Sequence, residues 1–247
     1  MFNKILILVL FTTILFSSPG HSSEKEIFLT STEYPPYYGQ ELKNNGFITE
    51  VITAAFEKEG YKVKVEFFPW LRAKTMAESG DSDGMFTLWH TQEREKWFVF
   101  SNPIPPHNVI GVYKRSDKEI TFETYQDLKP YIIGSVLGYA YSPEFMAAEL
   151  KGIRLYTDEK LITKLVQGRV DLAIIDRFQG NYLFKKKFSA KNNKFEFMEP
   201  PLEIRQQHLV ISKKTNSAHK IINDFNHGLE EIMNNGFYDD ILDEHGF

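Results

Sequence analysis

The chain of 247 residues contains no cysteine, which excludes disulfides, thiolate metal sites, cysteine nucleophiles and a lipid-bearing N-terminal cysteine. An excess of positive charge is also missing, because 29 Lys and Arg are set against 33 Asp and Glu, for a net charge of −4. Nucleic acid is therefore not an expected partner. The seven histidines show no close metal-ligand spacing, and no phosphate-binding or dinucleotide-binding glycine motif occurs. We expect neither a metal nor another cofactor.

Long apolar runs are scarce, and the most prominent one lies near the start of the chain. Lys4 precedes the apolar-dominated residues 5–16, and small and polar residues follow at 17–23. This run is shorter than the roughly 20 residues that a membrane-spanning helix needs. The pattern is typical of a secretory signal peptide. We expect cleavage after Ser22, with Ser23 as an alternative site, and so removal of residues 1–22 and export to the periplasm. An uncleaved N-terminal anchor is the alternative to cleavage.

Aromatic side chains are abundant, with 21 Phe, 12 Tyr and 3 Trp. Apolar residues make up 42% and charged residues 25%, which is typical of a folded globular protein and excludes a disordered or fibrous one. Flat rings fill protein cores and line ligand pockets alike. Their number alone therefore assigns no function.

Short apolar segments alternate with helical patterns along the rest of the chain. This alternation predicts an α/β fold with mostly parallel sheets. The expected strands are 27–30, 63–67, 84–88, 109–113, 132–136, 170–175, 195–198 and 209–212. The expected helices are 47–60, 70–79, 143–150, 161–167, 178–187 and a long C-terminal helix with Ile221, Phe225, Leu229 and Ile232 on one face. Polar stretches at 114–118 and 213–216 divide these elements and suggest two lobes.

Several motifs together resemble the family 3 bacterial extracellular solute-binding proteins, the periplasmic receptors of amino-acid ABC transporters. They occur in the family's order at residues 33–37, 46–51, 80–84, 91–94, 100–103, 165–176 and 235–238. One position departs from the family, which usually has an acidic residue where this chain has Ile48. Each motif is weak alone, but the ordered set spans residues 26–245 and is specific.

This resemblance implies the two-lobed periplasmic-binding-protein fold of type II, with two crossing hinge segments and a ligand cleft between the lobes. Lobe 1 is expected at 23–113 plus 210–247, and lobe 2 at 114–209. The implied protein is not an enzyme. It is a monomeric receptor that captures a small amino-acid-like or amine and carboxylate ligand by hinge closure and delivers it to an inner-membrane ABC permease.

Two charged residues are candidates for holding the ligand. In the family, the arginine at the position of Arg94 pairs with the ligand carboxylate, for which a guanidinium offers a matching fork of donors. A surface ion pair within residues 93–96 is the alternative. The aspartate at the position of Asp176 takes the ligand amino group in the family, and here it follows an apolar strand, where ligands bind in open α/β sheets. A helix N-cap is equally compatible with that position.

Aromatic residues are the candidates for stacking on the ligand. Tyr34 and Tyr37 belong to the first ligand loop that the resemblance implies, and Trp70 lies where the family often places a second aromatic residue. A role in the core is the alternative for each.

Two departures from the family concern ligand contacts. The family's Ser/Thr-rich stretch before the arginine is here Thr87-Leu88-Trp89-His90-Thr91, and its hydroxyl-bearing run in lobe 2 is Gly138-Tyr139-Ala140-Tyr141. Thr87, Trp89 and Tyr139 are therefore added as expected ligand contacts. The substitutions favour a modified, aromatic or larger amine or carboxylate over an ordinary L-α-amino acid.

Two other functions remain open from the sequence. The family includes a small enzymatic branch, the periplasmic cyclohexadienyl dehydratases, in which carboxylates perform acid–base chemistry in the same cleft. A stand-alone sensory receptor that signals through a membrane partner would bind its ligand by the same physics.

Overall fold

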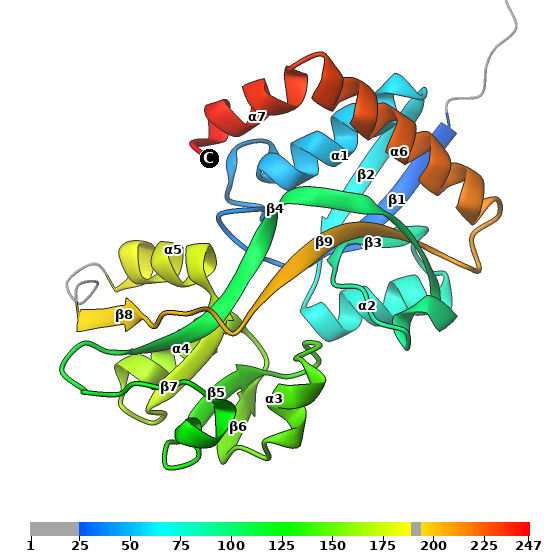
Figure 1. The fold of residues 1–247 in the computed structure, drawn as a ribbon. Coiled ribbons are helices and arrows are strands. Elements are labelled where there is room, and N and C mark those ends of the chain that lie inside the picture. Colours follow the sequence, from blue (N-terminus) through cyan, green and yellow to red (C-terminus); the bar gives the residue numbers. More distant parts are fainter. Residues whose placement is uncertain (1–24, 189–193) are drawn as a thin grey trace, which may run out of the picture.

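The computed structural model describes residues 25–188 and 194–247 (Figure 1). The expected signal peptide, residues 1–22, lies outside the described residues. Among the helices that are described, none is long and apolar enough to cross a membrane. Figure 1 shows two lobes, one above the other, joined by two long strands that run through both.

The upper lobe is built around three strands that pair in parallel and are covered by helices on both faces. Its elements are β1 (Lys25–Ser31), α1 (Phe47–Lys58), β2 (Tyr61–Phe67), α2 (Trp70–Ser79), β3 (Gly84–Leu88), α6 (Ala218–Asn234) and α7 (Phe237–His245), with a short 3-10 turn at Lys43–Asn45. Successive strand residues point to opposite faces. Phe86 therefore packs under α1 and α6, whereas Met85 packs against α2.

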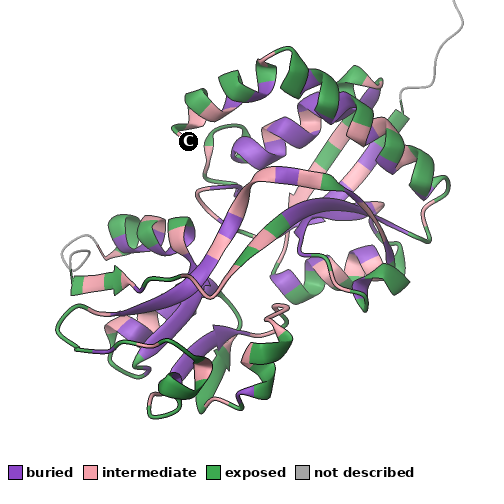
Figure 2. Ribbon diagram, viewed as in Figure 1, coloured by how far each residue is buried: buried purple, intermediate pink, exposed green. Residues whose placement is uncertain are grey.

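The lower lobe repeats this arrangement with shorter elements. They are β5 (Ile133–Val136), α3 (Pro143–Ala147), β6 (Gly152–Leu155), α4 (Asp158–Val166), β7 (Leu172–Asp176), α5 (Arg177–Lys187) and β8 (Phe195–Phe197), with a 3-10 turn at Tyr125–Leu128. One face of its sheet packs on α4 and α5, and the other packs beneath the 3-10 turn and α3. In Figure 2 the strands of both lobes are mostly buried, while the outward faces of the helices are exposed.

Two long antiparallel strands connect the lobes. β4 (Phe98–Arg115) and β9 (Glu203–Ser212) pair along most of their length, so that the sheet order is β2-β1-β3-β9-β4-β7-β5-β6. β9 pairs with β3 in the upper lobe, and β4 pairs with β7 and β8 in the lower lobe. The register of the β4–β9 pair shifts between Phe100 and Pro103 and again between Ile104 and Asn108. This β4–β9 ribbon therefore forms the two crossings.

The α/β class and the two-lobed fold are confirmed, but three details differ from the expectation. Half of the strand pairs are antiparallel, because β4 and β9 run against their neighbours. The expected strands 109–113 and 209–212 are the ends of the much longer β4 and β9. α7 and β6 were not expected at all. The lobe boundaries stay a prediction; β4 already pairs with the lower-lobe strand β7 at Ile110.

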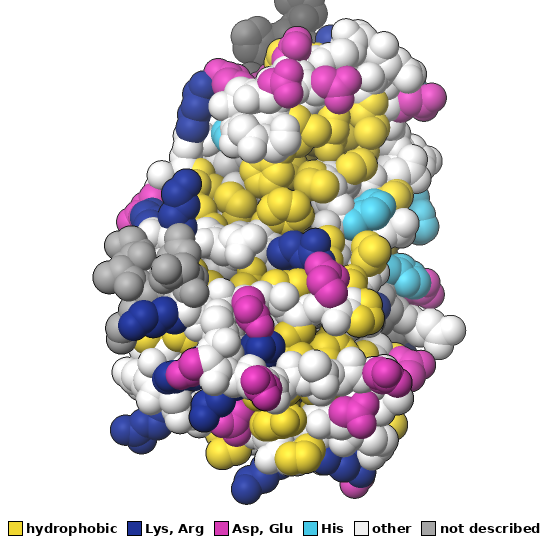
Figure 3. Space-filling view, turned by 60° about the vertical axis from the view of Figure 1, so that its left-hand side comes forward, with side chains coloured by type: hydrophobic (Ala, Val, Ile, Leu, Met, Phe, Trp, Pro, Cys, Tyr) yellow, Lys and Arg dark blue, Asp and Glu magenta, His cyan; other side chains and the backbone are white. Residues whose placement is uncertain are grey.

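Surface charge follows the composition. On the face drawn in Figure 3, Lys and Arg side chains are interspersed with Asp and Glu, and apolar side chains gather in the upper half and around the middle. Many ion pairs join two exposed side chains, as in the Lys186–Glu41 pair at 2.7 Å. Such pairs contribute little to stability.

Candidate functional site

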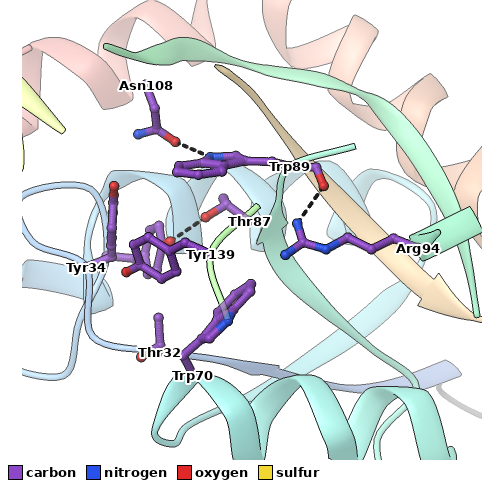
Figure 4. Close-up of a pocket in the computed structure, with 9 residues that line it drawn as sticks. Thr32, Tyr34, Trp70, Thr87, Trp89, Arg94, Asn108 and Tyr139 are labelled. Atoms are coloured by element: carbon purple, nitrogen blue, oxygen red, sulfur yellow. Dashed lines mark hydrogen bonds between the residues drawn. The ribbon is translucent and has the colours of Figure 1, made fainter. Parts of the chain in front are cut away.

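A small cavity lies where the two lobes meet (Figure 4). Its walls are formed by Thr32, Tyr34, Tyr38, Trp70, Thr87, Trp89, Arg94, Asn108 and Tyr139. Six of the expected ligand contacts are thus brought together: Tyr34, Trp70, Thr87, Trp89, Arg94 and Tyr139. The cavity has a volume of about 20 Å³, which is room for about one water molecule.

Arg94 is buried, with 6% of its surface exposed. It begins the 3-10 turn Arg94–Lys96, whose return toward β3 lets Nη1 donate to the Trp89 carbonyl oxygen at 2.7 Å. Nη2 reaches the Gly138 carbonyl oxygen of the other lobe at 3.5 Å. No carboxylate of the described residues forms an ion pair with it. The alternative of a surface ion pair is therefore wrong.

The electrostatics of Arg94 follow from this burial. Loss of solvent lowers the pKa of the guanidinium to about 10, and the group remains charged at neutral pH. The acidic residue with the largest effect on it is Glu78, which is itself paired with Lys74 at 2.5 Å. The Trp70 ring lies 5.6 Å from the guanidinium carbon and offers a cation–π contact. The cavity wall around Arg94 therefore provides no negatively charged partner for the guanidinium among the described residues.

Two tryptophans enclose the middle of the cavity. Trp70 is the first residue of α2, which Pro69 precedes, and its Nε1 donates to the Gly138 carbonyl oxygen at 3.2 Å. Trp89 directly follows β3, and its Nε1 donates to Asn108 Oδ1 at 2.8 Å. Both indole N–H groups are thereby fixed, which orients the two rings as rigid walls. Figure 4 shows Tyr139 between them.

Tyr139 fills most of the space that these walls enclose. Its ring makes edge contacts with Trp70 and Trp89, at centroid distances of 5.7 and 5.5 Å, and approaches Tyr34 at 6.5 Å. Its hydroxyl donates to Asp158 Oδ2 at 2.6 Å. A side chain of the lower lobe therefore occupies the cleft surface that the upper lobe provides.

The hydroxyls of Thr87 and Tyr38 connect the first ligand loop to β3. Thr87 donates to the hydroxyl of Tyr38, and both residues are buried. The Tyr34 ring stacks on Tyr38 at 5.6 Å, but its own hydroxyl is buried without a hydrogen-bond partner. Tyr34 therefore brings an unused polar group to the cavity.

Asp176 and Tyr37 lie behind the cavity and do not form its walls. Asp176 is fully buried as the N-cap of α5. Its oxygens accept four hydrogen bonds, from Tyr37 OH (3.0 Å), the Gln179 amide nitrogen (3.0 Å), the Val109 amide nitrogen (2.9 Å) and Asn108 Nδ2 (3.3 Å). Burial raises its pKa to about 6, although these bonds lower it. The N-cap interpretation is confirmed; contact with a ligand amino group stays a prediction.

A second and larger cavity, of about 540 Å³, lies on the other side of Tyr139. Pockets for small molecules typically measure about 300–1,000 Å³. Its walls include Tyr139, Asp158 and Gln179, with Lys186 and Lys187 toward its outer part. Tyr139, together with Thr32, lines both this cavity and the small one and separates them.

Several residues of the site were not expected from the sequence. Tyr38 could have been predicted as a site residue, because it follows Tyr37 in the same aromatic run. No sequence signal pointed to Asn108, because it lies in the first part of β4, which was not predicted to be a strand. Asp158 follows Thr157 at the start of a helix, where an acidic residue is ordinary. Among the described residues, no group of three or more His, Cys, Asp or Glu is placed to hold a metal ion.

Comparison with known families identifies the fold. A model of the bacterial extracellular solute-binding proteins, family 3, matches residues 27–246. The chain belongs to this family. Family 3 proteins are mainly binding proteins, and a ligand-binding protein is what a cavity between two lobes supports. No curated protein sequence matches this family 3 chain significantly.

Solved structures agree on the fold over most of the chain. A mutant of ArgBP from T. maritima has 20% identity and a TM-score of 0.73, covering 90% of this chain and 95% of its own. An ancestral arginine-binding protein bound to glutamine has 20% identity and a TM-score of 0.74, with 90% and 97% covered. A histidine kinase sensor domain with similarity to periplasmic binding proteins has 16% identity and a TM-score of 0.74, with 90% and 96% covered.

Proposed function

We propose that this family 3 protein is a monomeric periplasmic receptor that captures a small amino-acid-like or amine and carboxylate ligand and delivers it to an ABC permease of the inner membrane. The observation that carries the proposal is the Arg94 guanidinium, buried in the cavity wall without a carboxylate partner among the described residues. The receptor needs no cofactor and performs no reaction.

An anionic ligand group explains why Arg94 is tolerated there. A buried charge is costly unless it is paired. Its fork of donors matches a carboxylate, and a hydrogen bond to a charged group contributes about 1.5–3 kcal/mol. The hydrogen bonds of Arg94 to the carbonyl oxygens of Trp89 and Gly138 use two of its N–H groups and leave other donors free for a ligand.

Hinge closure follows from the distribution of the cavity walls. Tyr34, Trp70 and Arg94 belong to the upper lobe, whereas Tyr139 belongs to the lower lobe. A ligand that touches both favours the closed arrangement by its differential affinity for it. Among the described residues, the β4–β9 ribbon makes both crossings between the lobes and is the part that would bend. Its register shifts, between Phe100 and Pro103 and between Ile104 and Asn108, mark where its ladder is already interrupted.

Two observations keep second functions in view. The likeness to a histidine kinase sensor domain supports sensing by the same binding step. Permease and ATPase genes beside this one would favour transport, whereas a kinase or cyclase gene would favour sensing. Two buried aspartates with raised pKa values, Asp158 and Asp176, also suit acid–base chemistry of the cyclohexadienyl dehydratase kind.

A thermal unfolding screen tests the proposal. The mature protein is unfolded and refolded to remove any bound ligand, and is then screened with amino acids, polyamines, small carboxylates and prephenate. A ligand at 100 times its dissociation constant stabilises by about 2.7 kcal/mol, or roughly 5–11 °C for a chain of this size. A rise in melting temperature without turnover of the ligand supports a receptor. Formation of product from prephenate would instead support the enzymatic alternative.

Variants then test the site. We expect Arg94→Ala to weaken binding of the ligand found in the screen by about 10–150-fold, the equivalent of one charged hydrogen bond. Lys96→Ala is the matched control, because it removes an exposed positive charge two residues away. Equal affinities of Arg94→Ala and wild type would reject the site. Small-angle scattering should show compaction at saturation, and an unchanged profile would reject closure.

A further inference from the structure

Three buried polar atoms near Tyr139 have no hydrogen-bond partner within the part of the chain that the structure describes. They are Asp158 Oδ1, Gln179 Oε1 and Tyr34 OH, on residues with 6%, 1% and 4% of their surface exposed. Asp158 accepts from Tyr139, and the Gln179 side chain lies close enough to lower the pKa of the Asp158 carboxyl. Gln179 lines the same cavity, and the Tyr34 ring packs near that of Tyr139. Buried polar atoms are nearly always paired. Three unpaired atoms around one side chain therefore require an explanation.

The chemistry of these atoms specifies what would pair with them. A carboxylate oxygen and an amide oxygen can only accept hydrogen bonds, and a phenol oxygen can accept one as well. The missing partner is therefore a donor of several hydrogen bonds. Because Asp158 is a buried carboxylate, a positively charged donor also supplies the opposite charge that it lacks. A primary ammonium group, with three N–H donors, meets both needs.

Asp158 differs in this respect from the other acidic residues around the larger cavity. Glu41 is paired with Lys186 at 2.7 Å and Glu159 with Lys187 at 2.5 Å, all of them at the surface. Glu33 accepts from the Gln40 amide nitrogen at 3.3 Å. Within this set, Asp158 alone combines burial with an unpaired oxygen.

Tyr139 links this position to Arg94. The carbonyl oxygen of Gly138, directly before it, accepts from Arg94 and Trp70, and the Tyr139 hydroxyl reaches Asp158. The side chain thus runs from the Arg94 end of the site to the Asp158 end, between Trp89 and Trp70 (Figure 4). Its removal would join the two cavities that it separates.

We propose that Asp158, together with Gln179 and Tyr34, binds a protonated primary amine at the end of the ligand remote from its carboxylate, in place of the Tyr139 hydroxyl. The class of ligand is an amino acid with a terminal amine, separated from an anionic group by a spacer about as long as the tyrosine side chain it replaces. The anionic end of this inference rests on the proposed function, since it uses Arg94.

Asp176 does not compete for this amine. All four of its hydrogen bonds come from the protein itself, and one of them caps α5. A ligand amine at Asp176 would have to displace bonds that already exist. At Asp158, it would replace one bond from Tyr139 and add partners to three atoms that have none.

A ligand series tests the proposal in the full mature protein by calorimetric titration. The probes are 4-aminobutyrate, 5-aminovalerate and 6-aminohexanoate, each beside the carboxylate of the same length without the amine. We expect at least one amine to bind at least tenfold more tightly than its partner. Asp158→Asn should remove that preference, and Glu159→Gln, the exposed neighbour, should keep it. No preference in wild type, or a preference that survives Asp158→Asn, would overturn the inference.

This design separates the two proposals. If Arg94→Ala weakens amines and plain carboxylates alike, the Arg94 site stands whatever the effect of Asp158→Asn. If the carboxylates bind in an Arg94-dependent way with no amine preference, the proposed function survives and the inference about Asp158 fails.

A second test needs neither a carboxylate nor Arg94. Tyr139→Ala leaves space for benzylamine, a ring with an ammonium group, and for benzyl alcohol, its uncharged counterpart. We expect benzylamine to raise the melting temperature of Tyr139→Ala more than benzyl alcohol does. The difference should vanish in Tyr139→Ala/Asp158→Asn and be absent in Tyr141→Ala, whose hydroxyl contacts the Val136 amide instead. Equal shifts by both compounds in Tyr139→Ala would contradict the proposal.

Discussion

Asp158 and Asp176 stand at the starts of two consecutive helices, α4 and α5, and both are buried. Burial raises the pKa of each carboxyl to about 6. Their partners nevertheless differ. Among the described residues, Asp176 accepts four hydrogen bonds. Asp158 accepts one short hydrogen bond, from Tyr139, the Gln179 side chain also lowers its pKa, and its Oδ1 has no partner within hydrogen-bond distance.

The difference comes from helix capping. In α5 the aspartate is itself the N-cap and accepts from the Gln179 amide nitrogen. In α4 the preceding Thr157 is the N-cap and accepts from the Lys160 amide nitrogen. Asp158 is therefore released from capping its own helix. An acidic residue at a helix start is available for binding only where a neighbour has taken over the cap.

Replacing each of the two aspartates by alanine should give the largest difference in the loss of unfolding free energy between the two sites. Asp176→Ala removes a cap, worth about 1 kcal/mol, and leaves buried donors unpaired at about 1–3 kcal/mol each, so we expect a loss of about 3 kcal/mol or more. Asp158→Ala removes no cap and takes the acceptor from the Tyr139 hydroxyl and the nearby Gln179 side chain, so its loss should be less than half as large. Urea unfolding measures both, and equal losses would erase the distinction between the two sites.

The pH dependence of stability should expose the cost of the Asp158 charge. Its folded-state pKa of about 6 lies above the ordinary 3.8, so that the folded protein binds more protons between these values than the unfolded chain does. The contribution of Asp158 to stability therefore falls as the pH rises from 4 to 6, by on the order of 3 kcal/mol.

Asp158→Asn removes this titration. The stability of the variant relative to wild type should accordingly increase across the same pH range in urea unfolding experiments. Asp176 and Tyr139 remain in both proteins and serve as an internal control. Parallel curves for the two proteins would show that Asp158 titrates normally.

Removing the tyrosine hydroxyl that donates to each aspartate should lower the free energy of unfolding by different amounts, with a smaller difference between the two sites. Tyr139→Phe takes away the hydrogen bond that Asp158 accepts, at about 1.5–3 kcal/mol for a bond to a charged group. It should also raise the pKa of Asp158 further. Tyr37→Phe removes a bond of the same kind but leaves Asp176 with three donors, so we expect a loss at the lower end of that range, about 1.5 kcal/mol. Chemical denaturation at neutral pH compares the two, and a larger loss for Tyr37→Phe would reverse the assignment.

The smallest expected change in stability comes from removing the Thr157 side chain, which caps α4 in place of Asp158. Thr157→Ala should lower the free energy of unfolding by about 1 kcal/mol, as for other N-cap replacements. Glu159→Gln, in the same turn, breaks an exposed ion pair with Lys187 and should change stability by less than about 0.5 kcal/mol. If both variants behave alike in thermal unfolding, Thr157 is not the effective cap.

Much of the fold could be predicted because local signals agreed with it. Pro69 and Gly80 bound α2 on both sides, and the buried run 84–88 is a strand as expected. Most of β4 was not predicted because Pro103, Pro105 and Pro106 interrupt the pattern of an ordinary strand. The first half of β9 was not predicted because it is mostly polar. Their pairing joins segments about 100 residues apart, which no local pattern encodes.

The site could be predicted only in part. Arg94 and the aromatic residues were found through motif resemblance, and the structure brings most of them to one cavity. The unpaired oxygens of Asp158 and Gln179 could not be predicted, because hydrogen-bond satisfaction depends on which groups of other elements come within reach. Tyr139 was expected as a ligand contact, but its position between two cavities depends on how the two lobes meet.

The β4–β9 ribbon also bears on the order in which the chain can fold during its synthesis. The lower lobe draws its strands from residues 110–197, a continuous stretch, whereas β3 of the upper lobe must wait for β9 to pair Met85 with Val210. Until then β3 presents an unpaired edge, the kind of surface that invites misassembly. On the ribosome, the half encoded in the middle of the chain can therefore be complete before the half encoded at its beginning.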